Sequence, residues 1–252
     1  SDASPRLVAF DLDDTLAPSK SAIDPRIGDL LLALADRVEV AIISGGQLQQ
    51  FRTQVVERLP QAAPALLAHF HLMPTCGTQY YRLTAEGVET VYAHSLTDDE
   101  KQRALSAVRE EAERMGLWEA EPWGDILEDR GSQITFSALG QSAPLEAKMA
   151  WDPTGEKKNS LREAVASRIS DLEVRSGGST SVDITHRGID KAYGMNKLVE
   201  ATGIPLDDML FVGDRLDPDG NDYPVLAMGV ECQAVHGWED TAAFLDELIP
   251  TL

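Results

Sequence analysis

The stretch Leu7-Val-Ala-Phe-Asp-Leu-Asp-Asp-Thr-Leu16 decides the fold of this chain and points to its chemistry. An apolar run of strand character ends at Asp11, and Asp13 follows two positions later. Side chains two residues apart in an extended segment lie on the same side, so these two carboxylates repel each other unless a cation lies between them. A hard divalent cation such as Mg²⁺ is the expected partner. A carboxylate can also be a covalent nucleophile towards phosphorus. The plainer alternative is a strand that ends in an acidic turn.

The composition limits the classes of partner. The chain has 252 residues, enough for one large domain or two modest ones. It carries 42 acidic against 22 basic residues, a net charge of −20. This excess argues against nucleic acid and anionic membrane surfaces as partners. No run approaches the roughly 18 consecutive apolar residues of a membrane span. Cys76 and Cys232 lie far apart in the sequence and show no metal-ligand spacing. Two cysteines in a chain of this length fit a reducing compartment, so we expect a cytoplasmic location.

Strand-like and helix-like segments alternate in the first third of the chain and again at its end. Residues 38–43 are rich in β-branched residues, as expected for a parallel strand buried on both faces. The alternation predicts an α/β fold with a doubly wound, Rossmann-like parallel sheet. The expected strands are 6–10, 38–43, 79–83, 209–213 and 230–235, and the expected helices are 25–37, 47–59, 191–202 and 240–248.

The middle of the chain has a different pattern, in which strands are neighbours in sequence. The expected strands are 88–93, 133–139, 172–175 and 181–185, and the expected helices are 98–115 and 156–170. This pattern predicts an α+β domain at 85–186, inserted into a discontinuous core domain made of residues 1–84 and 187–252. The strands of the inserted domain could also supply the surface of a homodimer.

Polar residues follow core strands or begin core helices in four places, and ligands of open α/β sheets bind at such places. The first is Asp11–Thr15. The second is Ser44-Gly-Gly46, whose hydroxyl and backbone N–H groups suit a phosphate but also a plain tight turn. The third is Lys191, at the start of a helix. The fourth runs from Asp214 to Asp222 and holds five acidic or amide side chains in nine positions, which indicates a metal site.

Together the four segments resemble, in order, the motifs of the haloacid dehalogenase superfamily of phosphotransferases. The resemblance implies that Asp11 is the nucleophile, that Asp13 is the general acid and base, and that Lys191 holds the nucleophile and the developing charge. It implies phosphate binding by Thr15, Ser44 and Gly45. It also implies a Mg²⁺ site made by Asp11, the Asp13 backbone carbonyl and Asp214, with Asn221 or Asp222 as support.

One branch of the superfamily, the eukaryotic-type phosphomannomutases, is more similar. The shared segments are Pro74–Gly77, Glu128–Arg130, Gly177–Lys191 and the long fourth motif. The branch implies that the inserted domain holds the sugar and a second phosphate, and the candidate residues for this are Arg130, Lys148, Ser181 and Asp183. Three positions depart from the pattern, because Lys20, Gln141 and Lys148 stand where it has arginine. Lysine lacks the planar fork that binds phosphate through two hydrogen bonds, and glutamine carries no charge.

This departure bears on the reaction. A mutase must return the phosphoryl group to a reoriented sugar faster than water attacks, and it needs a firmly held bisphosphate intermediate for this. We therefore expect a Mg²⁺-dependent phosphohydrolase that acts on a small phosphate ester, such as a sugar phosphate, through an aspartyl phosphate. The alternative is a phosphomannomutase, which interconverts mannose 6-phosphate and mannose 1-phosphate. A phosphorylatable signalling module is the third hypothesis, and Asp13 and the long insertion argue against it.

Overall fold

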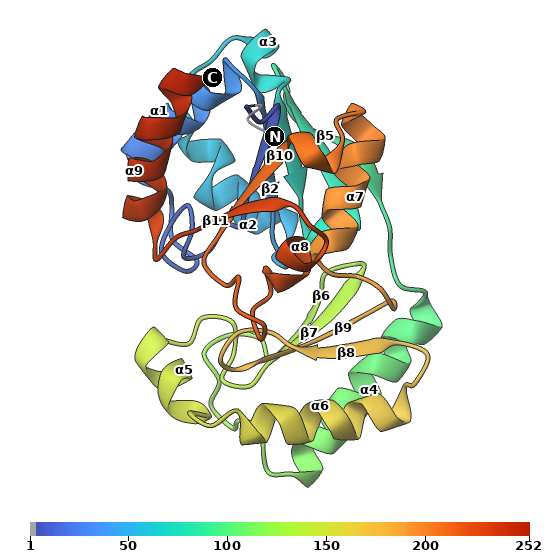
Figure 1. Cartoon of the computed structure of the whole chain (residues 1–252). Coiled ribbons are helices and arrows are strands. Elements are labelled where there is room, and N and C mark those ends of the chain that lie inside the picture. The colour runs from blue at the N-terminus through green and yellow to red at the C-terminus, as the bar shows by residue number, and fades with distance from the viewer. Residues whose placement is uncertain (1–3) are drawn as a thin grey trace. The chain divides into compact units, whose positions relative to one another are not determined.

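The computed structural model describes residues 4–252, and the chain divides into two compact units (Figure 1). The core unit comprises the residues up to Ala93 together with Ile189–Leu252, and the inserted unit comprises His94–Gly188. Both units mix helices with strands, so the predicted α/β class is confirmed. None of the helices within residues 4–252 combines the length and the apolar composition that crossing a bilayer requires.

The core unit is built on one seven-stranded sheet. Its strands are β1 (Leu7–Phe10), β2 (Glu39–Ile43), β3 (Phe70–Met73), β4 (Gln79–Thr84), β5 (Gly87–Ala93), β10 (Met209–Gly213) and β11 (Glu231–Ala234). They lie in the order β11-β10-β1-β2-β3-β4-β5. The strands from β11 to β3 are parallel, whereas β4 and β5 are antiparallel additions at one edge. The predicted doubly wound parallel sheet is therefore present.

One strand belongs to a different unit from the one expected. The sequence pattern places residues 88–93 in the inserted domain, but they belong to β5, which pairs with β4 in the core sheet. The inserted unit consequently begins at His94 rather than at residue 85. A hairpin strand has the same residue pattern whether its sheet ends or continues beside it, so the sequence did not distinguish the two cases.

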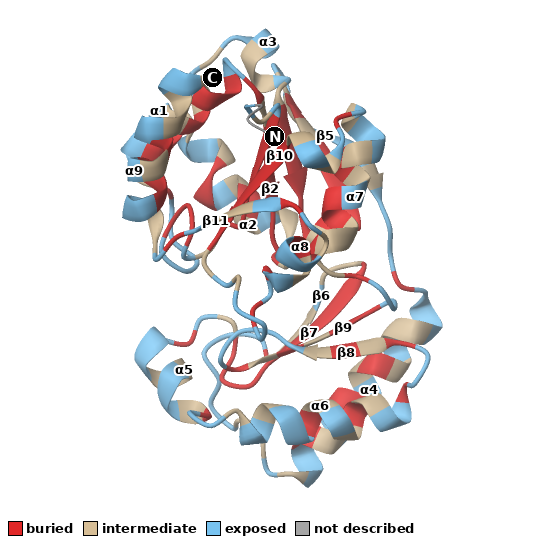
Figure 2. Ribbon diagram, viewed as in Figure 1, coloured by how far each residue is buried: buried red, intermediate tan, exposed pale blue. Residues whose placement is uncertain are grey.

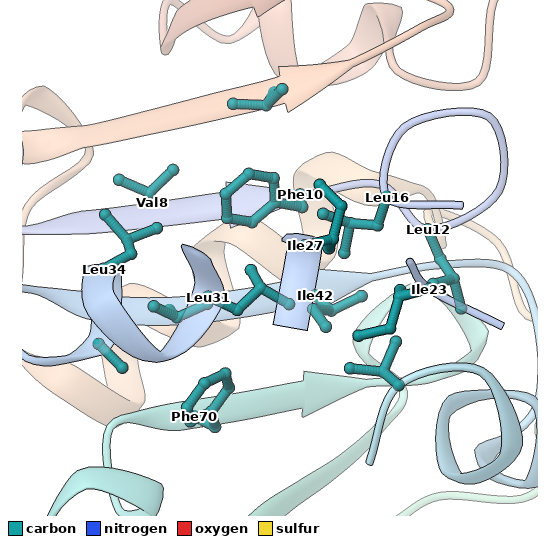
Figure 3. Packing of buried hydrophobic residues seen from close by; sticks show 14 of the residues in the cluster. Val8, Phe10, Leu12, Leu16, Ile23, Ile27, Leu31, Leu34, Ile42 and Phe70 are labelled. Atoms are coloured by element: carbon teal, nitrogen blue, oxygen red, sulfur yellow. The ribbon is translucent and has the colours of Figure 1, made fainter. Parts of the chain in front are cut away.

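Helices cover both faces of the core sheet and bury its apolar side chains. They are α1 (Pro25–Ala35), α2 (Leu48–Gln54), α3 (Pro64–Leu67), α7 (Lys191–Thr202), α8 (Tyr223–Ala227) and α9 (Trp238–Leu248). On one face, Phe10 and Ile42 of the sheet pack with Leu31 of α1 (Figure 3). On the other face, Phe211 packs with Leu198 of α7. Burial on both faces explains why β1 and β10 are apolar along their length.

The inserted unit is an antiparallel sheet with helices over one face. Its elements are α4 (Asp98–Arg114), β6 (Leu127–Asp129), β7 (Gln133–Ser137), α5 (Leu145–Trp151), α6 (Glu156–Arg168), β8 (Glu173–Ser176) and β9 (Ser181–Thr185). The strand order is β6-β7-β9-β8. Ile134 and Phe136 of β7 share an apolar cluster with Val108 of α4 and Leu161 of α6. Figure 2 shows that buried residues of α4 and α6 follow the sides that face the sheet.

The register of the parallel strands brings two of the polar segments together. Phe10 of β1 pairs with Val212 of β10, so Asp11 and Gly213 leave the sheet side by side. The Asp11 amide donates a hydrogen bond to the Val212 carbonyl oxygen at 3.0 Å. Strand order reverses between β1 and β10, since β2 follows β1 on one side and β10 lies on the other. Such a switch point is where open α/β sheets bind their ligands.

Candidate active site

A buried lysine joins two carboxylates beside the ends of β1 and β10. The Nζ atom of Lys191 donates to Asp11 Oδ1 and to Asp222 Oδ1, both at 2.6 Å. Lys191 is 1% exposed, Asp11 is 6% exposed and Asp222 is completely buried. Charge-assisted hydrogen bonds this short are strong, and burial keeps water from competing for them. Residues from three distant segments of the sequence thus form one rigid cluster.

The first turn of α7 holds Lys191 in place. Asp190 caps this helix, because its side chain accepts a hydrogen bond from the Tyr193 amide at 3.0 Å. The same turn packs closely on the segment Thr75–Gly77, and a Cβ added to Gly194 would lie 2.8 Å from the Cys76 carbonyl oxygen. Glycine permits this close approach of two backbones. The lysine is therefore placed by a cap and by a tight backbone contact.

The loop after β10 holds Asp222 against Lys191. The Arg215 amide donates to Asp222 Oδ2 at 3.0 Å, and the Asp222 amide donates to the Arg215 carbonyl oxygen at 3.0 Å. A Cβ added to Gly213 would lie 2.5 Å from Asp222 Oδ2, so glycine leaves room for the carboxylate. Both oxygens of Asp222 accept hydrogen bonds within the protein, whereas Asn221 is exposed.

The carboxylates of this site are arranged as a cation site. Asp11, Asp214 and Asp222 each offer an oxygen atom, and these atoms lie within 4.8 Å of one another. Burial raises the pKa of Asp11 well above its ordinary value; Lys191 opposes this effect, while Asp222 and Asp214 add to it. Burial works against the charge on Lys191, but Asp11 and Asp222 outweigh it and raise the pKa of this lysine. One lysine does not balance three carboxylates, and an all-oxygen donor set suits a hard divalent cation such as Mg²⁺.

Thr15 and Ser44 lie at the same end of the sheet. Thr15 is completely buried, and its Oγ1 donates to Asp214 Oδ1 at 3.4 Å. Its carbonyl oxygen accepts a hydrogen bond from Thr241 Oγ1 at 2.6 Å. Ser44 follows β2, the neighbour of β1, and its Oγ accepts from the Gly46 amide at 3.0 Å. Apart from its two chain neighbours, a Cβ added to Gly45 would meet no atom of residues 4–252 within 4 Å, so the space beside this loop is open.

Asp13 is directed to α2 and is not part of the three-carboxylate cluster. Gln50 Nε2 donates to Asp13 Oδ2 at 3.0 Å, and Gln54 Nε2 donates to Asp13 Oδ1 at 3.1 Å. The Lys20 amide donates to the same Oδ1 at 3.0 Å. Sequence reasoning passed over both glutamines. The available signal was their spacing of four residues on the helix that follows the Ser44–Gly46 turn, which puts them on one helix face.

The inserted unit carries a row of polar side chains on the sheet face opposite its helices. The row runs across paired positions from Glu128 through Thr135 and Asp183 to Arg175. Thr135 Oγ1 donates to Asp183 Oδ1 at 2.9 Å, and Arg130 Nη2 donates to Glu128 Oε2 at 3.0 Å. Burial raises the pKa of Asp183, against the attraction of Arg130. The structure therefore brings two of the predicted substrate residues, Arg130 and Asp183, into one polar group.

The other predicted residues of this unit are arranged as follows. Ser181 pairs with Ser137 and lies on the same sheet face as Asp183. Gln141 Nε2 donates to Ser137 Oγ at 2.7 Å, so a neutral hydrogen bond holds this side chain. Lys148 is half-buried on α5. In the core unit, Lys20 is exposed and has a left-handed backbone, with φ of 55°.

Known proteins resemble this chain along most of its length. The family model for eukaryotic phosphomannomutases matches residues 27–251. Phosphomannomutase 1 of Mus musculus is 25% identical over 232 residues, which covers 88% of this chain and 83% of the mouse protein. A haloacid dehalogenase-like hydrolase from Bacteroides thetaiotaomicron superposes with a TM-score of 0.62 at 14% identity, covering 97% of this chain and 100% of that one. A C-terminally truncated IMP-nucleotidase of Plasmodium falciparum gives a TM-score of 0.74 at 15% identity, and the superposition covers 99% of this chain and 72% of the nucleotidase.

At such low identity the two solved structures show a shared fold and nothing more. The resemblance drawn from the four motifs is confirmed by this fold and by the family match. The match begins within the first turn of α1 and runs through the inserted unit to residue 251 of the core unit. The chain belongs to the eukaryotic phosphomannomutase family.

Proposed function

We propose that this protein is a hexose phosphomutase that interconverts mannose 6-phosphate and mannose 1-phosphate through a phosphoryl group carried on Asp11. The observation that carries the proposal is the buried Asp11–Lys191–Asp222 cluster at the switch point of the sheet, in a chain of the phosphomannomutase family. The sequence alone ranked hydrolysis first. Family membership supports the mutase reaction better than a general phosphohydrolase, and the ranking is reversed accordingly.

Asp11 would be the nucleophile. Lys191 binds its Oδ1, so we assign the attack on phosphorus to Oδ2. As the bond from Oδ2 to phosphorus forms, the ester P–O bond breaks, and Asp13 gives a proton to the leaving oxygen. In the other half of the reaction, which forms the hexose bisphosphate, Asp13 takes a proton from the free hydroxyl of a bound hexose monophosphate. That oxygen then attacks phosphorus, and Asp11 leaves as a carboxylate.

Thr15, Ser44 and Gly45 would bind the phosphoryl oxygens, with Lys191 offsetting the charge that develops on them. Mg²⁺ would be held by the Asp11 and Asp214 carboxylates and the Asp13 backbone carbonyl. When bound, it supplies the positive charge that phosphoryl transfer needs. Asp222 would support this site by fixing Lys191, because both its oxygens already accept hydrogen bonds. The exposed side chain of Asn221 is the weakest member of the predicted set.

Residues of the inserted unit would bind the rest of the substrate. We assign the distal phosphate to Arg130 and Lys148, and the sugar hydroxyls to Ser181 and Asp183. The polar row around Asp183 supports this role, because its hydroxyl, carboxylate and guanidinium groups suit a phosphorylated sugar. The proposal places the enzyme in the cytoplasm, in keeping with two cysteines that form no disulfide.

Hydrolysis of a sugar phosphate is the second candidate, and Gln141 favours it. This residue stands where the mutase pattern has arginine, and a neutral hydrogen bond to Ser137 holds it. Lys20 and Lys148 replace two further arginines with point charges, which bind phosphate with less geometric specificity. With fewer charge-assisted contacts to the distal phosphate, the sugar monophosphate would leave the phosphorylated enzyme more readily, and water would then take the phosphoryl group from Asp11.

Phosphorus NMR separates the two reactions in one sample. Mannose 1-phosphate is incubated with enzyme, Mg²⁺ and a catalytic amount of a hexose bisphosphate. Formation of mannose 6-phosphate in excess of inorganic phosphate supports the mutase, and inorganic phosphate alone supports the hydrolase. Asp11→Asn is the control for both. Gln141→Arg restores the missing charge and is expected to shift the product ratio further towards the isomer.

A further inference from the structure

Two glutamines of α2 bind both carboxylate oxygens of Asp13. Gln50 Nε2 donates to Oδ2 at 3.0 Å, and Gln54 Nε2 donates to Oδ1 at 3.1 Å. Gln54 uses its second amide hydrogen on the Ser21 carbonyl oxygen, at 2.7 Å. The two side chains lie on one face of α2, since four residues make about one helical turn. A pair of neutral donors thus holds a carboxylate that belongs to a different segment of the core unit.

The surroundings are built to permit this contact. Gln54 is 3% exposed, and within residues 4–252 its Oε1 has no hydrogen-bond partner. Turning the amide over would place Oε1 against the Asp13 carboxylate, so the charge on Asp13 fixes the amide orientation at the expense of an unsatisfied oxygen. A Cβ added to Gly46 would lie 2.0 Å from Gln50 Oε1, so the absence of a side chain there leaves room for Gln50.

The number of donors assigns the two oxygens of Asp13. A carboxylate has about four lone-pair directions, two on each oxygen. Gln54 and the Lys20 amide occupy those of Oδ1. Gln50 occupies one direction on Oδ2, which leaves one for a proton.

We propose that Gln50 and Gln54 are positioning residues, an amide clamp that fixes the Asp13 side chain and makes Oδ2 the oxygen that carries the transferred proton. The inference rests on the proposed function, because it takes Asp13 as the group that exchanges protons with the substrate. The clamp acts through the side chain of Asp13 and touches neither the phosphoryl group nor the carboxylates of Asp11 and Asp214. The competing account is that the glutamines only tie the Asp13–Ser21 loop to α2.

The nature of the leaving group separates the two accounts. When Asp11 attacks 4-nitrophenyl phosphate, the P–O bond breaks to give a phenolate that is stable without a proton. When Asp11 attacks an alkyl phosphate such as a sugar 6-phosphate, the leaving oxygen needs a proton from Asp13. A residue that positions Asp13 therefore matters for the alkyl ester and not for the first release of nitrophenolate, whereas general loosening of the loop affects both.

The variants are Gln50→Met, Gln54→Met and the double variant, which keep side-chain length and remove the donors. Gln49→Met is the matched control, since Gln49 is exposed on the same helix. Gln50 is half-buried, so its single variant remains informative if loss of the buried Gln54 impairs folding. Single-turnover rates are measured for 4-nitrophenyl phosphate and for the best alkyl ester from a sugar-phosphate panel, together with kcat and KM.

We expect the double variant to lose at least about tenfold in the alkyl-ester rate, within the roughly 10²- to 10⁴-fold that general acid–base catalysis supplies. The nitrophenolate burst and the KM for the alkyl ester should stay within about twofold of the unmodified enzyme and of Gln49→Met. Equal losses on both esters, or none on either, would overturn the clamp. Asp13→Asn keeps the two proposals apart. If it shows no contrast between the esters, the assigned role of Asp13 fails and the clamp with it. If it shows the contrast and the glutamine variants do not, the clamp alone fails.

Discussion

Replacing Lys191 by Met should strongly destabilise the core unit. The change keeps a long side chain of similar helix propensity at the first position of α7 and removes the charge between Asp11 and Asp222. Two hydrogen bonds of 2.6 Å are lost, and the two carboxylates, 6% and 0% exposed, are left buried together. Removing one partner of a buried ion pair costs roughly 3–5 kcal/mol. This is a large part of the roughly 5–15 kcal/mol by which native proteins are stable.

Urea unfolding followed by circular dichroism in Mg²⁺-free buffer measures this loss. A slope of about 3 kcal/mol per molar urea converts the loss into a midpoint that is lower by about 1–2 M. Lys197→Met is the matched control, because Lys197 lies on the same helix and makes a partly exposed ion pair with Glu200 at 3.2 Å. Such a pair contributes at most about 0.5 kcal/mol. If both variants lose equally little, the buried cluster does not hold the site together as described.

Three further predictions concern elements that support the site or the sheet. Burial lowers the pKa of His71, which contacts Tyr80 and Glu39, so the unfolded state takes up a proton below about pH 6.5 while the native state resists it. The free energy of unfolding should then decrease as the pH is lowered from 7 to 5, by at most about 1.4 kcal/mol per pH unit. The variant His71→Gln should reduce this pH dependence in urea titrations over the same range, and an unchanged pH dependence would refute the assignment. Cys76 has φ of 59°, and Cys76→Asn should raise the melting temperature, with a gain of up to about 1 kcal/mol, because asparagine tolerates the left-handed region; a lower melting temperature would contradict this. Gly194→Ala should cost about 1–3 kcal/mol despite better helix propensity, because the added methyl meets the Cys76 carbonyl oxygen; calorimetry that shows a gain would exclude the tight contact.

The sequence was most informative where chemistry follows directly from strand ends. Asp11 and Asp214 could be predicted as neighbours because parallel strands deliver their carboxyl ends to one edge of a sheet. Lys191 could be expected there because a phosphoryl transition state needs a cation. The choice between Asn221 and Asp222 could not be made, since a loop without periodicity does not say which of two adjacent side chains turns inward.

The contacts of Asp13 illustrate what the sequence leaves out. Gln50 and Gln54 reach it from another segment, and glutamine on a helix face is ordinarily a solvated residue. Only the packing of α2 against the loop after β1 shows that these amides have a charged partner. The polar row of the inserted unit is a similar case. Its members, including Thr135 and Arg175, come from different strands whose register the sequence did not specify.

The fate of the phosphoryl group on the enzyme tests the central claim most directly. Enzyme labelled at Asp11 from a hexose bisphosphate is mixed with mannose 1-phosphate or with buffer, and the label is followed into sugar and inorganic phosphate. Our account predicts that the label passes to the sugar faster than to water, and that Asp11→Asn takes up no label. Release as inorganic phosphate alone, at a rate that the sugar phosphate does not change, would contradict the mutase and leave a hydrolase.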